Sequence, residues 1–386
     1  MRSALLIAAI AASAYAQDAQ VVQERPSLWR RTDSGAFSIP AGRMVRLVTR
    51  GHVVVRGSDG DQVTYQLTER VRTRTVEEAH RLFGSEITSL ARRNGVTVVT
   101  LLPLARENVT VDWQVNVPRR LAGVLVDAQL GDVEAYDLDG SLHVDTTAGL
   151  IHCDRIKGGV DANTGGGEIR LGTIGGPARC VSAAGSIIVE STAGDTICRT
   201  AGGEIQVHDA GGQLALSTEG GNIQVDRAAA SVQAHTGEGV IQIAQAGGAV
   251  FADTRGGAID VGGSRGANCQ SAAGMIRVKT SSGPLKIQTA MGSIVAELLS
   301  GARLEDSSLV AGSGDITVLI PSNLALSVVA RNDSGAMPRI LSDFSELRAK
   351  SATFNRPLVY EGAINGGGPV LTLNTAGGVI YVRKLK

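Results

Sequence analysis

Three glutamines stand out as residues that could bind a ligand: Gln206, Gln224 and Gln242, which occupy every eighteenth position of one stretch of the chain. An amide side chain donates and accepts hydrogen bonds and does not titrate. A regular row of amides therefore favours weak, repeated contact with a neutral polymer or another protein, where many small contacts add together. The row is equally compatible with a solvated amide ladder that only stabilises the fold. It does not suit acid–base catalysis, which requires groups that exchange protons.

No other pattern in the sequence indicates catalysis, a cofactor or a metal. Cleavage of a glycosidic bond requires two neighbouring carboxylates, yet the solvent-facing acids come singly, as at Glu168, Glu204 and Asp260. A zinc site requires clustered Cys and His ligands, but the sequence has no Cys-x-x-Cys motif. The histidines of the repeats fall at outward positions: His143, His152, His208 and His235. We predict no catalytic residue, no cofactor-binding residue and no metal ligand.

The elements that must position these side chains follow from glycines in a strict repeat. Glycine recurs at every eighteenth position from Gly131 to Gly257, and Gly274 and Gly292 continue the series with a single step that is one position shorter. A valine or isoleucine stands at the second position after each of these principal glycines. Such self-similarity predicts a solenoid, in which each repeat buries its apolar face only against its neighbours.

Each repeat divides into two halves, because a second glycine series runs from Gly140 to Gly266 with one alanine among its members. Apolar and polar residues alternate in each half, which is typical of a strand with one buried face. Ile205 and Val207 are predicted to point inward, and Gln206 between them toward water. The sequence therefore predicts an all-β fold, a parallel β-solenoid of 18-residue coils with one strand in each of two facing sheets.

A hydroxyl ladder accompanies the glycines. Threonine or serine stands at the third position before each principal glycine, from Thr146 to Thr289. A hydroxyl at such a corner can bond a backbone group of the turn or the hydroxyl of the next coil. An ice-binding or ligand-binding threonine array is the alternative. We favour the structural role, because the position shares the inward parity of the core and lacks a second threonine at the next position on the same face.

The first residues predict export. An apolar run from Ala4 to Ala12 follows a positive charge, and the Ala-Tyr-Ala that ends at Ala16 has the pattern of a signal-peptidase site. Met1–Ala16 is therefore predicted to be a signal peptide, with the mature chain beginning at Gln17. No later segment reaches the roughly 20 apolar residues of a membrane helix, so no membrane span is predicted.

Residues 17–126 precede the repeats and predict a small β-rich cap with one helix. Such a cap would cover the apolar cross-section at the end of a solenoid. Apolar spacing predicts the helix over Val76–Arg93, with Thr75 as its N-cap. Strand-like runs occur at Met44–Val48, His52–Arg56, Gln62–Leu67, Val96–Leu101 and Val111–Val117.

The repeats are predicted to occupy residues 127–320, with an irregular segment and a terminal coil in residues 321–386. The period is lost over Arg331–Tyr360, which we predict to be a loop or flap packed on the end. It returns over residues 371–382, where inward apolar residues and the ladder threonine Thr375 match one further coil.

Four cysteines raise the question of disulfides, which are common in exported proteins. Cys180 and Cys198 occupy the same inward position of successive coils, so their Cα atoms would lie about 4.8 Å apart, within disulfide range. Stacked parallel side chains, however, rarely adopt the dihedral angle that a disulfide requires. We predict buried free thiols, also at Cys153 and Cys269, and Cys180–Cys198 is the pair to test.

Composition and charge exclude several broad classes of protein. The chain has 37 basic and 37 acidic residues, so no net field attracts it to nucleic acid or to an anionic membrane. The 49 glycines and the 3% of aromatic residues agree with short strands and tight turns. We predict no nucleic-acid partner.

From about Phe37 onward the chain carries a set of recognisable motifs. They are Val115-Asn116-Val117-Pro118, repeats of the type Gly131-Asp132-Val133-Glu134-Ala135, and the terminal Asn365-Gly366-Gly367-Gly368-Pro369 and Gly378-Val379-Ile380-Tyr381-Val382. In these motifs the chain resembles the bacterial putative-adhesin family, a domain family of unknown function. The resemblance implies a β-solenoid in the cell envelope or outside the cell, and it brings no functional residues with it.

Two classes of function remain. The first is a non-catalytic exported protein of the periplasm, cell surface or extracellular space, an adhesin or scaffold that contacts a polysaccharide or a protein through a solenoid face. The second is a polysaccharide-cleaving β-helix enzyme, a lyase or hydrolase. Enzymes of that kind build a groove from long coils and irregular loops, whereas these coils are uniformly short. We therefore favour the first class, and Arg331–Tyr360 is the segment in which a catalytic site could lie.

Overall fold

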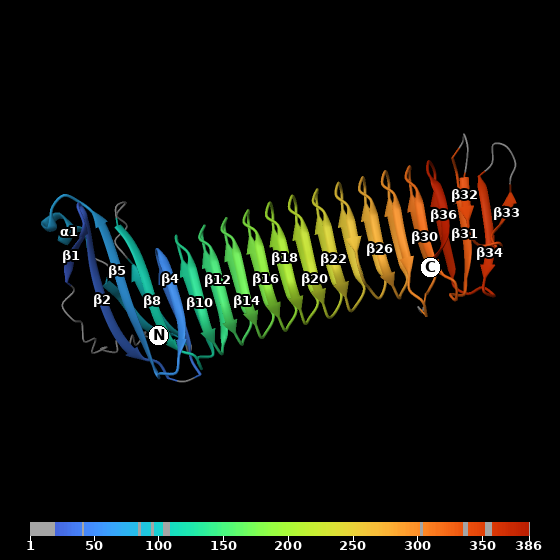
Figure 1. Cartoon of the computed structure of the whole chain (residues 1–386). Helices are drawn as coiled ribbons and strands as arrows, with labels where there is room; N and C mark the ends of the chain where they lie inside the picture. Colours follow the sequence, from blue (N-terminus) through green and yellow to red (C-terminus); the bar gives the residue numbers. More distant parts are fainter. Residues whose placement is uncertain are drawn as a thin grey trace, which may run out of the picture. The chain divides into compact units, whose positions relative to one another are not determined.

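The chain folds into two compact units, Met1–Gly194 and Asp195–Lys386, and both are parallel β-solenoids, as the sequence predicts (Figure 1). The predicted signal peptide lies outside the described residues. The computed structural model describes residues 20–40, 42–83, 86–93, 96–102, 109–301, 304–334, 339–351 and 357–385.

In the first unit, each coil adds one strand to sheet A and one strand to sheet B. Each strand pairs in parallel with the corresponding strand of the next coil, so that Ile151 pairs with Ile169 in sheet A and Leu142 with Val160 in sheet B. Its regular strands are β9 (Gly123–Ala128), β10 (Val133–Leu138), β11 (Ser141–Thr146), β12 (Ile151–Ile156), β13 (Val160–Thr164), β14 (Ile169–Ile174), β15 (Ala178–Ser182) and β16 (Ile187–Thr192).

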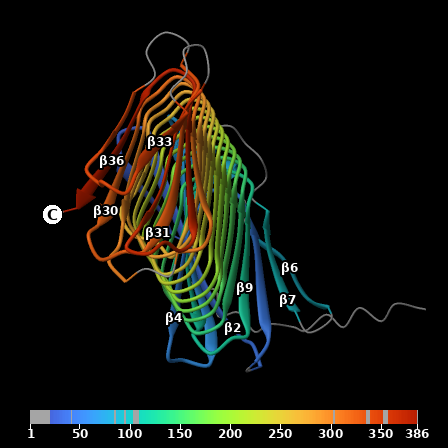
Figure 2. The same cartoon turned by 90° about the vertical axis from the view of Figure 1, so that its right-hand side faces the viewer.

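The second unit repeats this arrangement, with its coils stacked in register (Figure 2). Its sheet A contains β18 (Ile205–Ala210), β20 (Ile223–Ala228), β22 (Ile241–Ala246), β24 (Ile259–Val261), β26 (Ile276–Ser281), β28 (Ile294–Leu298) and β30 (Ile316–Pro321). Its sheet B contains β17 (Thr196–Thr200), β19 (Leu214–Thr218), β21 (Val232–Thr236), β23 (Val250–Thr254), β25 (Ala267–Ser271), β27 (Leu285–Thr289) and β29 (Ser307–Ala311).

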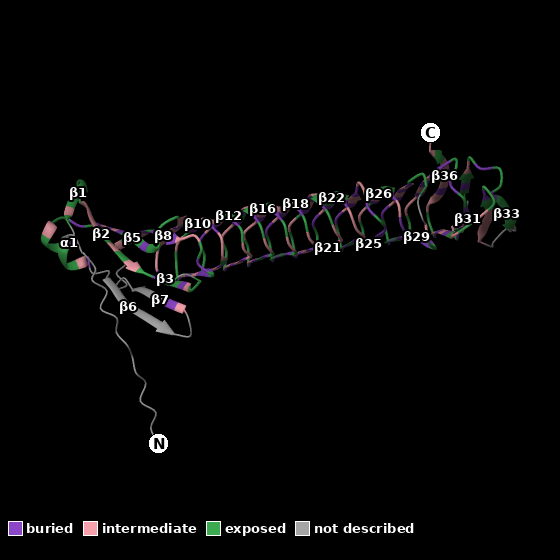
Figure 3. Cartoon of the chain, turned by 90° about the horizontal axis from the view of Figure 1, so that it is seen from below, coloured by how far each residue is buried: buried purple, intermediate pink, exposed green. Residues whose placement is uncertain are grey.

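The core lies between the two sheets of each unit, and the predicted parity is confirmed. The residues at the second and fourth positions after each principal glycine are at most 1% exposed, whereas residues between them, such as Gln242, face outward. Seen from below, the second unit shows β18, β22 and β26 in one row and β21, β25 and β29 in the other (Figure 3). Each buried Ile or Val side chain contributes about 1.5–3 kcal/mol before conformational entropy is subtracted, so the stack supplies its own stability.

Principal glycines occupy a corner that has no room for a side chain. A Cβ atom on Gly221 would lie 1.9 Å from the backbone oxygen of Gly203 in the previous coil. The Thr218 hydroxyl spans the same corner, donating to Gly203 O at 2.9 Å and accepting from Gly221 N at 3.1 Å. Close approach of successive coils explains the glycine period, and these hydrogen bonds confirm the structural role of the hydroxyl ladder.

At the N-terminal end, the order of coils in the stack differs from their order in the sequence. The coil of β3 (Met44–Thr49) and β4 (His52–Ser58) lies between the coil of β7 (Val96–Leu102) and β8 (Val109–Pro118) and that of β9 and β10. Antiparallel strands then extend both sheets: β5 (Gln62–Arg72), β2 (Leu28–Ser38) and β1 (Val21–Arg25) beyond β8, and β6 (Glu86–Arg93) beyond β7. Residues 17–126 thus contribute two full coils besides capping strands.

The predicted helix is only half correct. Helix α1 (Val76–Leu82) begins as expected, because the Thr75 hydroxyl accepts a hydrogen bond from Glu78 N at 3.3 Å. Residues 86–93 of the predicted span form strand β6, which pairs antiparallel with β7, the next strand in the sequence, and this pairing outweighs the helical spacing. No helix in the described part of the chain has the length and hydrophobicity to cross a membrane.

At the C-terminal end, the predicted loop over Arg331–Tyr360 is wrong. That span holds the end of β31 (Leu326–Asn332), all of β32 (Arg339–Ser342) and β33 (Arg348–Ser351), and the start of β34 (Leu358–Ile364). The predicted terminal coil is confirmed as β35 (Val370–Thr375) and β36 (Val379–Leu385), which lies between β29–β30 and β31–β32. The glycine period is lost here because the outermost coil, β31 and β32, comes earlier in the sequence than β35 and β36, which form the coil directly beneath it.

Candidate functional site

The three predicted glutamines form one row on the outer face of sheet A in the second unit. Gln206 pairs with Gln224 across β18 and β20, and Gln224 pairs with Gln242 across β20 and β22. Gln242 is exposed and the other two are half-buried. The row arises because strand parity turns all three outward and the constant repeat length places them in register. Their role in binding stays a prediction.

The side chains beside the glutamine row are tied to one another across strands. Gln224 Nε2 donates to Asp226 Oδ1 at 3.2 Å, and Asp226 Oδ2 lies 2.7 Å from His208 Nδ1. The hydrogen bond with His208, followed by that with Gln224, lowers the pKa of Asp226. Arg227 Nε donates to Asp209 Oδ1 at 3.0 Å. Asp226 and Arg227 are thus each engaged by a neighbouring side chain, and the amide of Gln224 takes part in the same network.

Sequence reasoning missed a polar cluster around Tyr136 on the outer face of sheet A in the first unit. Tyr136 Oη donates to Glu134 Oε2 at 2.6 Å and lies 3.3 Å from His152 Nδ1. The guanidinium groups of Arg56 and Arg155 lie 5.5 and 5.8 Å from the centre of its ring. These residues come from β4, β10 and β12, which are neighbours in the sheet. An offset of one repeat relates Glu134 to His152 and could have revealed part of the cluster.

The electrostatics of this cluster suit binding or structural bracing rather than proton transfer. Burial, followed by the hydrogen bond to Glu134, raises the pKa of Tyr136 to about 12, so its hydroxyl stays protonated at neutral pH. Arg155 binds Asp137 with two hydrogen bonds of 2.7 and 3.0 Å, and these hold the pKa of Asp137 below its ordinary value. Both residues adopt left-handed backbone angles, with φ of 55° and 62°, which their mutual ion pair helps to stabilise.

Other histidines of the repeats also contact carboxylates. His143 lies 2.7 Å from Asp145 and 3.3 Å from Asp161, and His235 lies 3.0 Å from Asp253. Within the described residues, no group of three or more His, Cys, Asp and Glu side chains could hold a metal ion. The contacts of His143 with Asp161 and of His235 with Asp253 join neighbouring strands, whereas His143 and Asp145 lie on the same strand, β11.

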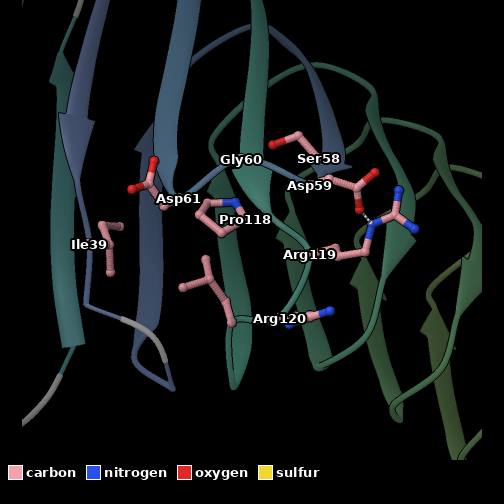
Figure 4. A pocket seen from close by; sticks show the side chains of 9 residues that line it. Ile39, Ser58, Asp59, Gly60, Asp61, Pro118, Arg119 and Arg120 are labelled. Carbon is pink, nitrogen blue, oxygen red and sulfur yellow. Dashed lines mark ion pairs between the residues drawn. The ribbon is translucent and has the colours of Figure 1, made fainter.

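The first unit has a small pocket of about 420 Å³ where the turn after β4 meets the turn after β8 (Figure 4). Arg119 Nε lies 3.0 Å from Asp59 Oδ1 on one wall. Asp61 and Arg120 add one charge of each sign, so the lining is balanced. None of the predicted binding residues lines the pocket. Its charged side chains form an ion pair and are not arranged as the acid and base of a catalytic site. Its apolar residues are Ile39, Pro118 and Leu121.

All four cysteine side chains are buried. Cys153 and Cys269 are free thiols, and burial raises the pKa of each to about 12. Thiolates are the reactive form of cysteine, so these two residues are poor nucleophiles. Cys198 is also a free thiol, as the sequence predicts for the buried cysteines.

Comparisons with solved structures give matches at very low sequence identity and with low TM-scores. No family model and no curated protein matches the chain. A crystal structure named as a putative cell adhesion protein from Clostridium sporogenes has 8% identity, covers 92% of this chain and 100% of its own, and has a TM-score of 0.20. A putative adhesin from Bacteroides fragilis has 10% identity, with coverage of 92% and 97% and a TM-score of 0.21. Neither name identifies a ligand.

Proposed function

We propose that this protein is a non-catalytic protein of the cell surface or envelope that contacts a polymer or another protein through a face of its solenoid. The observation that carries the proposal is the row of Gln206, Gln224 and Gln242, which lie in register on adjacent strands of sheet A. Side chains held on paired strands lose little conformational entropy when a ligand binds. More of the binding free energy of their many weak contacts is therefore retained.

The polar groups around the row support a neutral partner. Asp226 and Arg227 are engaged with His208 and Asp209. A neutral polymer would meet amide donors and acceptors without having to displace a strongly charged group. Amides do not titrate, so binding by the row should change little between pH 6 and 8 apart from effects of the neighbouring histidine.

Retention on immobilised polymers tests the proposed face. The protein is passed over beads that carry cell-wall glycan or extracellular-matrix protein, and the triple variant of Gln206, Gln224 and Gln242 to Lys is compared with it. A matched control changes three exposed glutamines outside the row, Gln213, Gln270 and Gln288, to Lys. We expect the first variant to lose retention and the control to keep it. Equal retention of both variants would rule out this face.

The same experiment separates binding from catalysis. A polysaccharide-cleaving enzyme would release soluble oligosaccharides from the glycan beads, whereas a binding protein would leave the glycan intact. Chromatography of the flow-through measures that release.

Export has its own test. Expression of the full chain with a C-terminal tag, followed by cell fractionation and N-terminal sequencing, should yield protein that begins at Gln17 outside the cytoplasm. Recovery of uncleaved protein from the cytoplasm would contradict the predicted location.

A further inference from the structure

Phe251 is exposed where folding gives no reason for an aromatic side chain. It lies in β23, on the outer face of sheet B in the second unit, and its exposed fraction is 49%. In the described part of the chain, it is the single aromatic residue among the exposed large hydrophobic side chains. Strand parity places this side chain in contact with water. A polar residue here would not lower the stability of the fold, whereas an exposed aromatic ring does not gain the free energy of burial. Single exposed hydrophobic side chains are common on protein surfaces, so the polar groups beside the ring decide whether it can serve a ligand.

Amide side chains flank the ring on both sides. Gln233 pairs with Phe251 across β21 and β23, and Asn268 pairs with it across β23 and β25. Neighbouring strands lie about 4.8 Å apart, so both amides lie within a few ångströms of the ring. Gln233 is exposed, whereas the side-chain oxygen of Asn268 is buried and has no hydrogen-bond partner among the described residues. Gln233 can therefore meet a ligand directly, and a ligand donor that reaches Asn268 would satisfy its unpaired oxygen.

The two direct neighbours of the ring on its own row are uncharged, and Gln233 is preceded in the row by the uncharged Ala215 and Ile197. On the other side, Asn268 is followed by the exposed Lys286. In the next row, Asp253 lies 3.0 Å from His235. The cation of Lys286 and the carboxylate of Asp253 have opposite signs, so the surroundings of the ring present no single charge that would select an ionic ligand.

We propose that Phe251, Gln233 and Asn268 form a binding site for a neutral hexopyranose glycan. One face of a pyranose ring carries C–H groups and packs on the apolar face of an aromatic ring, while its hydroxyls donate to and accept from amides. The strands extend on either side of Phe251, so successive sugars of a chain can lie along the sheet. This site lies on the sheet opposite to the glutamine row and does not depend on it.

Affinity electrophoresis tests the site directly. The purified protein is run in gels that contain one of three neutral polysaccharides, dextran, laminarin or mannan, or polygalacturonate as an acidic control. Phe251→Ala and Phe251→Leu are run beside it, and Met291→Ala is the matched control, because Met291 is an exposed apolar residue elsewhere in the same unit. Circular dichroism verifies that each variant is folded, which we expect because Phe251 is exposed.

We expect retardation in at least one neutral gel, an apparent affinity at least about tenfold weaker for both Phe251 variants, and no change for Met291→Ala. The leucine variant keeps an apolar side chain but removes the ring face, so its loss of binding would identify stacking as the cause. The proposal is overturned by retardation only in polygalacturonate, by no retardation in any neutral gel, or by equal retardation of wild type and Phe251→Ala. The triple glutamine variant, run in the same gels, distinguishes failure of this site from failure of the sheet A row.

Discussion

Ile223 and Gln224 are neighbours in the chain with opposite environments. Ile223 is fully buried between the sheets, whereas Gln224 lies on the outer face with its amide bonded to Asp226. The difference follows from strand parity alone, because successive side chains of a strand point to opposite faces. Single substitutions at the two positions should therefore have very different consequences.

Replacement of Ile223 by Asp should unfold the second unit or split its stack. A charge buried without a partner costs several kcal/mol, which is comparable to the roughly 5–15 kcal/mol that stabilises a typical domain. Thermal unfolding followed by circular dichroism measures the effect. The matched control replaces Gln206, Gln224 and Gln242 by Ser and should melt within a few degrees of wild type. Identical melting of the aspartate variant would contradict the inward position of Ile223.

Tyr136 should titrate late. Its pKa of about 12, compared with the ordinary 10.0, arises from burial and from the hydrogen bond to Glu134. A raised pKa in the folded state means that the neutral phenol stabilises the fold below pH about 10, and that this contribution is lost as the pH rises from 10 to 12. The difference in ultraviolet titration between wild type and Tyr136→Phe should have its midpoint near 12. Glu134→Gln should move that midpoint toward 10, and a wild-type midpoint at 10 would disprove the interaction.

The cysteines should not react with a thiol reagent in the folded protein, and all four should react after unfolding. Burial keeps Cys153 and Cys269 protonated, as their raised pKa values require. Without prior reduction, unfolded protein should consume four equivalents of a thiol reagent. Recovery of two equivalents would show that Cys180 and Cys198 form a disulfide.

At the scale of the element, the corner between two strands sets the repeat. Gly203 and Gly221 approach so closely that a side chain would strike the backbone, and the Thr218 hydroxyl uses the same short distance for two hydrogen bonds. The arrangement recurs at the terminal coil, where Thr375 Oγ1 donates to Gly314 O at 2.9 Å and accepts from Gly378 N at 3.1 Å. The principal glycine and the ladder hydroxyl therefore act together to join successive coils.

Two adjacent glycines offer a test of this corner. A Cβ on Gly221 would lie 1.9 Å from the Gly203 oxygen, whereas a Cβ on Gly220 would meet nothing within 4 Å. Gly221→Ala should therefore lower the free energy of unfolding by about 1–3 kcal/mol or more, as overpacking does. Gly220→Ala should change it by no more than about 0.5 kcal/mol, as at other surface positions. Urea denaturation of the two variants measures the difference, and equal stabilities would show that close approach does not explain the glycine period.

At the scale of the molecule, antiparallel strands extend both sheets at the N-terminal end of the first unit and protect the last parallel strand of sheet B in the second unit. In the second unit, β34 pairs antiparallel with β31, and β33 pairs antiparallel with β34. Without them, β31 would present an open row of backbone groups to other chains. The hairpin is thus expected to keep the protein from associating through this end.

Prolines at Val359 and Glu361 should detach β34 from β31, because proline cannot donate a backbone hydrogen bond and its ring disrupts the ladder. The variant is expected to form concentration-dependent aggregates in light scattering. Alanine at the same two positions keeps the backbone donors and should remain dispersed. A proline variant that scatters no more than the alanine variant would show that the hairpin is dispensable.

The sequence by itself determined the repeating part of this protein. The constant glycine period and the alternation of apolar residues are local signals, and they were sufficient to predict the coils, the inward and outward positions, the hydroxyl ladder and the glutamine row. They were sufficient because each coil contacts its neighbour at a constant offset, so register follows from counting.

Only the tertiary structure decided the ends of each unit and the clusters that form there. The coil of β3 and β4 is inserted beneath β9 and β10, and that of β35 and β36 beneath β31 and β32, so spatial order departs from sequence order. The insertion brings Arg56 beside Tyr136, although several strands separate the two in the sequence. No local pattern encodes such pairings, because they depend on the free energy of joining strands distant in the chain. Residues 86–93 are a different case, because β6 pairs with β7, the next strand in the sequence, with Arg93 opposite Val96.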